Sequence, residues 1–119
     1  QLPTYTRRSF EVNTMGREST FEKALIEAVD EGLLMLGESG REIVYFRLRH
    51  SYALTKENVP AHPEIFIECL RKILGSGSKV IEKAIIKSLY RKLGLAYMEE
   101  KNFDFFECLS EAKKAAKLS

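Results

Sequence analysis

The residues that could act as nucleophiles, bases or metal ligands are few and widely separated in this chain. His50 and His62 are its histidines, and Cys69 and Cys108 are its cysteines. Nucleophilic catalysis needs a base within hydrogen-bond reach, and a zinc site needs several ligands at short spacings. None of these residues has such a neighbour in the sequence. We therefore expect no catalytic residue, metal ligand or cofactor, and we rank an enzyme third among the function classes.

A short stretch rich in glycine and serine is the remaining feature that could bind a phosphate group. Gly75, Ser76, Gly77 and Ser78 come directly before Lys79. A P-loop follows a strand and has a different spacing of glycine and lysine, and no strand is predicted before this stretch. We interpret it as a turn between two helices.

Length and composition indicate one cytoplasmic domain. The chain has 119 residues, of which 45% are hydrophobic and 30% charged, with a formal net charge of +2. A charge this small does not by itself predict binding to nucleic acid or to a membrane surface. No apolar run approaches the roughly 18 residues that a membrane span needs. The two cysteines lie in apolar patterns, which is typical of core thiols in a reducing compartment.

Apolar residues at helical spacing predict an all-α fold, a compact bundle of about five short helices over residues 19–119. Residues 1–18 lack this periodicity and are expected to form a flexible or extended arm or linker. Ser19 and Glu22 form a capping box that should start the first helix, and Gly37 should end it in the left-handed conformation. The other helices are expected at residues 39–52, 63–74, 79–93 and 102–118, with one helical turn after Thr55.

Two of the expected helices carry opposite charges. Residues 19–36 hold four acids and one base, a net −3, whereas residues 79–93 hold five bases and one acid, a net +4. A solvated face is the simplest interpretation of the basic helix. The alternatives are an acidic protein surface, including residues 19–36 of a second copy, and a phosphate backbone. The basic residues that repeat every four positions are Lys79, Lys83, Lys87 and Arg91.

The last expected helix has more aromatic rings than one helix face can bury. Phe103, Phe105 and Phe106 lie within four residues, and a helix of a small domain buries one face. At least one ring should therefore meet a partner or the N-terminal arm. We expect Phe105→Ser to shift the assembly state while the fold persists.

Basic and aromatic residues alternate on the second expected helix, and this pattern favours nucleic-acid binding as the alternative function. Arg47 and Arg49 lie close to Tyr45, and recognition helices present such groups to a groove. Lys83 and Lys87 complete this alternative set. The simpler interpretation is that Tyr45, Phe46 and Leu48 serve the core and the arginines face water.

Five short motifs carry a resemblance to a known family. They are LGES at residues 36–39, IVYFRL at 43–48, VPAHPEIF at 59–66, LRKILGSGSKVIEKAI at 70–85 and SLYRKLGL at 88–95. In these motifs the chain resembles a small archaeal family described as a Nitrosopumilus-type output domain. The resemblance implies an output or interaction module of an archaeal signalling protein, without catalytic residues. We expect a protein partner, with a homodimer preferred, and we expect no membrane contact.

Overall fold

The chain folds into α-helices joined by short 3-10 turns. The computed structural model describes residues 16–118, and all regular structure in this range is helical. The elements are α2 (Gly16–Leu33), η1 (Leu34–Leu36), α3 (Gly37–Tyr52), η2 (Lys56–Ala61), α4 (Pro63–Leu74), η3 (Gly75–Gly77), α5 (Ser78–Leu93) and α6 (Phe105–Leu118). The predicted all-α class is confirmed for this part of the chain. Residues 1–15 of the expected arm lie outside it.

Several helix ends match the local sequence signals. Pro63 is in the first turn of α4, and η2 supplies the helical turn expected after Thr55. α5 ends at Leu93, and the next residue, Gly94, has a φ of 73° and a ψ of 27° and donates its backbone N–H to the Arg91 carbonyl oxygen at 3.2 Å. Glycine adopts this left-handed conformation without steric cost. The glycine and proline signals at these ends were therefore correct.

Other helix ends differ from the prediction. α2 begins at Gly16, so the capping box at Ser19 falls inside the helix. α2 ends at Leu33, before the 3-10 turn η1. Gly37 has a φ of 83° but a ψ of 166°, so it turns the chain into α3 and does not adopt the expected left-handed helical conformation. The positive φ still favours glycine at this position.

The start of α6 also differs from the prediction. It begins at Phe105, whereas the sequence predicts a start near Asn102. The Asp104 carboxylate accepts hydrogen bonds from the backbone N–H groups of Phe106 at 2.9 Å and Glu107 at 3.1 Å. A carboxylate that satisfies the first free amides of a helix is an N-cap. Asp104 therefore fixes the helix start and leaves Phe103 in the preceding segment.

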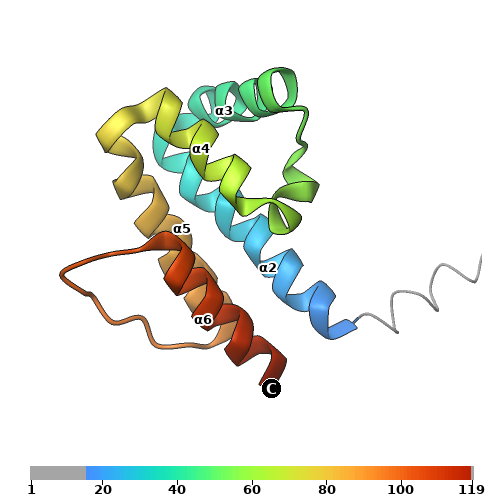
Figure 1. Cartoon of the computed structure of the whole chain (residues 1–119), viewed down its shortest axis with the longest axis vertical. Helices are drawn as coiled ribbons and strands as arrows, with labels where there is room; N and C mark the ends of the chain where they lie inside the picture. Colours follow the sequence, from blue (N-terminus) through green and yellow to red (C-terminus); the bar gives the residue numbers. More distant parts are fainter. Residues whose placement is uncertain (1–15, 119) are drawn as a thin grey trace, which may run out of the picture.

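α2 and α5 form the central antiparallel pair of the fold (Figure 1). They approach closely at Gly32, where an added Cβ atom would lie 2.5 Å from Ile85 Cγ1. α6 packs against both helices, whereas α3 packs mainly against α4 at the other end of the molecule. Among residues 16–118, no element covers one side of α3 (Figure 1).

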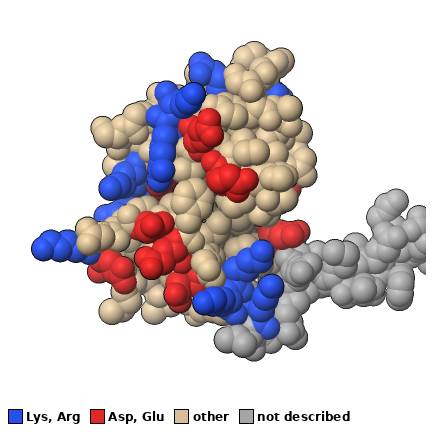
Figure 2. Space-filling view, viewed as in Figure 1, with Lys and Arg blue, Asp and Glu red and all other residues tan. Residues whose placement is uncertain are grey.

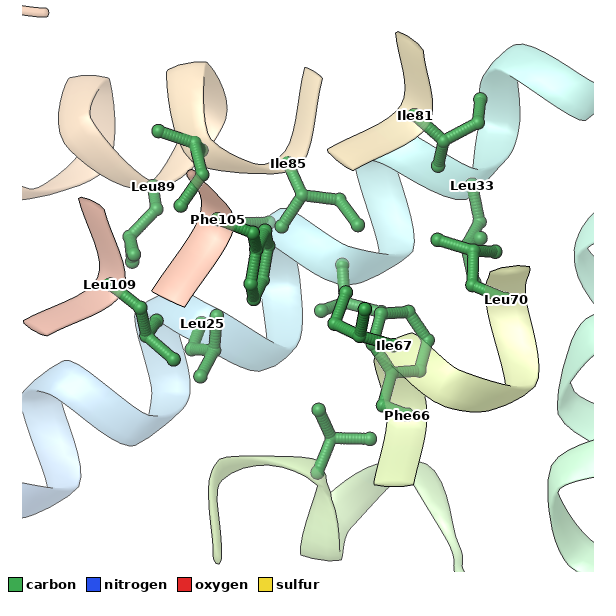
Figure 3. Close-up of a cluster of buried hydrophobic side chains, with 14 of the residues drawn as sticks. Leu25, Leu33, Phe66, Ile67, Leu70, Ile81, Ile85, Leu89, Phe105 and Leu109 are labelled. Atoms are coloured by element: carbon green, nitrogen blue, oxygen red, sulfur yellow. The ribbon is translucent and has the colours of Figure 1, made fainter. Parts of the chain in front are cut away.

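The hydrophobic core is built between α2, α3, α4, α5 and α6, and Figure 3 shows side chains that α2, α4, α5 and α6 contribute to it. Its labelled side chains are Leu25, Leu33, Phe66, Ile67, Leu70, Ile81, Ile85, Leu89, Phe105 and Leu109. Cys69 is fully buried and Cys108 partly buried, and both are free thiols. The prediction that Cys69 is a small core residue is confirmed.

Candidate interaction surface

Internal ion pairs engage most of the basic residues predicted on α5. Lys83 Nζ lies 2.6 Å from a Glu99 carboxylate oxygen, and Lys87 Nζ lies 3.7 Å from the other. The hydrogen bond between Lys83 and Glu99 raises the pKa of the ammonium and lowers the pKa of the carboxyl. Lys79 is exposed and forms no ion pair with another described residue. The four predicted residues are therefore not a free basic face.

The acidic helix and the basic helix meet within one chain. Glu31 on α2 accepts hydrogen bonds from Lys92 at 2.6 Å, Ser88 at 2.7 Å and Arg91 at 3.0 Å, all on α5. The hydrogen bond from Lys92 is the main reason that the pKa of Glu31 is lowered. Glu27 also lies 3.7 Å from Lys92. The complementarity that pointed to a second copy is thus satisfied inside the protein.

The three phenylalanines near α6 have different environments. Phe105 is 2% exposed and belongs to the core, so it is not available to a partner as the sequence predicted. Phe103 is half-buried, with Lys83 Nζ 5.8 Å from the centre of its ring. Phe106 is 38% exposed and forms an edge contact with Phe105. Phe105, Leu109 and Ala112 are spaced i, i+4, i+7 and are all buried, so they form the face of α6 that packs against α2 and α5.

An open hollow of about 500 Å³ lies between α6 and the segment that precedes it. Its lining includes the rings of Tyr90, Tyr97 and Phe103. Acidic side chains gather over the same region in Figure 2, and Glu100 and Glu107 belong to the lining. The negative potential of these carboxylates disfavours the binding of an anion in the hollow.

Neither reactive group in this hollow is activated. Burial, and then neighbouring glutamates, raise the pKa of the Cys108 thiol. A thiol with a raised pKa carries little nucleophilic thiolate. Tyr90 donates its hydroxyl to the Cys108 carbonyl oxygen at 2.9 Å, and its pKa is raised to about 12, mainly by burial. The hollow therefore offers shape and charge without an activated nucleophile.

A buried carboxylate joins α4 to α5. Glu82 is 1% exposed and accepts hydrogen bonds from Arg71 at 3.0 and 3.1 Å and from Ser78 at 2.8 Å. Bidentate pairing with arginine satisfies both carboxylate oxygens. We assign Glu82 a structural role, because both of its oxygens are engaged within the fold.

The outer side of α3 exposes large apolar side chains. Ile43 is 57% exposed and Phe46 is 53% exposed, one helical turn apart. The His50 ring stacks on Phe46 with 4.0 Å between ring centres. The inner side carries buried Leu48 and Tyr45, whose hydroxyl donates to Asp30 at 2.9 Å. The interpretation of Tyr45 and Leu48 as core residues is confirmed, whereas Phe46, which was expected in the core with them, is exposed.

Exposed charged side chains border this apolar row. Arg47 and Arg49 are exposed, and neither forms an ion pair in residues 16–118. The carboxylate of Glu42 is 66% exposed and lies 3.8 Å from the neighbouring Arg41. Arg47 and Arg49 therefore face water, whereas Lys83 and Lys87 of the same alternative set are held by Glu99 on another part of the fold.

Further features bear on metal, membrane and family relationships. Within the described range, no three histidine, cysteine or acidic side chains gather to hold a metal ion. No helix in that range combines the length and the apolar character needed to cross a bilayer. Comparisons with models of protein families, with curated proteins and with solved structures give no match for this chain.

Proposed function

We propose that this chain is a non-enzymatic helical interaction module that self-associates through the outer side of α3. The observation that carries the proposal is the exposed apolar row of Ile43 and Phe46 on a helix whose opposite side is fully used by the core. Anchors one helical turn apart are typical of helix-mediated recognition. Burying a large apolar side chain contributes about 1.5–3 kcal/mol, so covering this row favours association.

The ion pairs that already engage the basic residues of α5 favour a protein partner over nucleic acid. Binding to a phosphate backbone is driven by the release of the nucleic acid's counterions when several free cationic side chains neutralise its phosphates. Lys83, Lys87 and Arg91 already have carboxylate partners in the same chain. The role as an output module of an archaeal regulator and the cytoplasmic location stay predictions.

Replacing Phe46 by serine tests the proposal. We expect Phe46→Ser to weaken self-association about tenfold or more, because each copy loses most of one ring from the contact. Sedimentation velocity over a concentration series measures this change. The helical circular dichroism should persist, since more than half of the ring is exposed in a single chain.

Val80→Ser is the matched control for this variant. Val80 is 58% exposed on α5 and lies outside the α3 row. The substitution Val80→Ser should leave the association constant unchanged. Equal association by the wild type and by Phe46→Ser would remove α3 as the self-association surface.

A further inference from the structure

The order of charges along α3 distinguishes between two ways in which a second copy could cover its apolar row. Glu38 and Glu42 lie in the N-terminal half of the helix, whereas Arg47 and Arg49 lie in the C-terminal half. We infer that two copies meet through α3 in an antiparallel arrangement, with Glu42 of each copy facing Arg49 of the other. This inference rests on the proposed self-association.

Helix geometry brings Glu42 and Arg49 to the same flank of the apolar row. They are seven residues apart, which is close to two helical turns or about 10.5 Å along the axis. Both side chains line one shallow hollow beside α3. The midpoint between them is next to Phe46, so a two-fold axis at this point brings the two Phe46 rings together. The same axis places Glu42 of each copy opposite Arg49 of the other, so the contact contains two such pairs.

The orientation decides whether Glu42 meets Arg49. In a parallel two-fold pair, the two Glu42 side chains lie on opposite sides of the contact, and so do the two Arg49 side chains, so these residues form no pair between copies. In the antiparallel pair Glu42 of each copy meets Arg49 of the other, and unlike charges in contact favour association. A two-fold contact of this kind is self-complementary and closes as a dimer.

Both charged groups are available for contacts between copies. Arg49 has no ion-pair partner among residues 16–118. Glu42 has only the distant Arg41 Nε at 3.8 Å, while Arg41 Nη1 is held at 3.0 Å by Asp30. The new pairs would therefore form without breaking a short ion pair of the fold.

The contact is small. α3 has 16 residues, which gives a face about 24 Å long and less area than the ~800 Å² per partner of a standard interface. We therefore expect a dimer that dissociates on dilution and weakens as salt screens the exposed ion pairs.

Charge reversal at these two positions tests the orientation. We expect Glu42→Arg and Arg49→Glu each to weaken self-association about fivefold or more, because each replaces two attractive contacts by two repulsive ones. The double variant with both substitutions should regain most of the wild-type affinity. Sedimentation velocity at two salt concentrations measures all four proteins.

Glu22→Arg and Lys23→Glu on α2 make the same changes in net charge away from α3. They should leave association unchanged, which separates local pairing from overall repulsion. Single reversals without effect, in a protein that still loses association with Phe46→Ser, would overturn the antiparallel contact and leave self-association through α3 standing. Opposite effects of the two single reversals would also overturn it, because net charge alone would then explain them.

Discussion

Phe105 and Phe106 are neighbours in the chain but have opposite roles in the fold. Phe105 is buried in the core and Phe106 lies at the surface. Consecutive residues of a helix point about 100° apart, so a shift of one position would exchange the two rings. The apolar pattern fixes this phase, because Phe105, Leu109 and Ala112 have the spacing i, i+4, i+7 and are all buried. Asp104 sets where α6 begins, since its carboxylate caps the helix.

Truncation of the two rings should separate their contributions. We expect Phe105→Ala to lower the free energy of unfolding by about 3–5 kcal/mol, the usual cost of a cavity left by a core aromatic residue. Phe106→Ala should cost less than about 1 kcal/mol, because its ring is already partly in water. Urea unfolding followed by circular dichroism measures both. Equal losses would contradict the assignment of Phe105 to the core.

At the scale of the elements, most helices could be predicted from local signals. Apolar periodicity, the first-turn proline of α4 and the glycine after α5 are all short-range features, and the fold uses them as predicted. The pairing of α2 with α5 depends on contacts far apart in the sequence. Their opposite charges were visible, but the charges alone could not show that the two helices pair within one chain.

The close approach of α2 and α5 makes Gly32 sensitive to a single methyl group. An added Cβ would meet the Ile85 side chain at 2.5 Å and the Ile85 backbone nitrogen at 3.2 Å. We expect Gly32→Ala to destabilise the protein by about 1–3 kcal/mol through overpacking, although alanine is ordinarily favoured over glycine in a helix. Thermal or urea unfolding measures the change.

Gly77→Ala provides the control for this substitution. Gly77 has a φ of −67°, and an added Cβ there has no neighbour within 4 Å. Alanine should be neutral or slightly stabilising at this position. The packing explanation fails if Gly32→Ala is as stable as the wild type.

The contact of Glu31 with α5 should make stability depend on pH. Its pKa in the folded protein lies below the ordinary value of 4.5, mainly because of the hydrogen bond from Lys92. A carboxyl whose pKa is lowered by folding contributes stability above its unfolded pKa and loses it as the pH falls through the folded pKa.

Glu31→Gln should therefore cost stability at pH 7 and little or none near pH 3. We expect a loss below about 1 kcal/mol at pH 7, because the Glu31 carboxylate is 44% exposed and screened by solvent. Urea unfolding at both pH values measures the difference. Glu22→Gln, at an exposed acid with no described partner, should show no such pH dependence, and a loss for Glu31→Gln that is equal at both pH values would rule out this account.

At the scale of the whole molecule, most basic residues of α5 are paired inside the fold, whereas one side of α3 is not covered by any element of residues 16–118. An interaction module was predicted from the sequence, but its surface was placed on Phe105 and on α5. Phe46 was expected in the core together with Leu48, although the two residues are about 160° apart on a helix. That separation is too wide for one buried face, and it is the signal that could have identified the outer side of α3.

The central claim is that single chains associate through this uncovered side. Light scattering on the eluting wild-type protein, over about a hundredfold range of concentration, tests it most directly. We predict a mass that rises from the 13.6 kDa of one chain toward twice that value as the concentration increases. A mass that stays at 13.6 kDa throughout the range would contradict self-association and, with it, the antiparallel contact of α3.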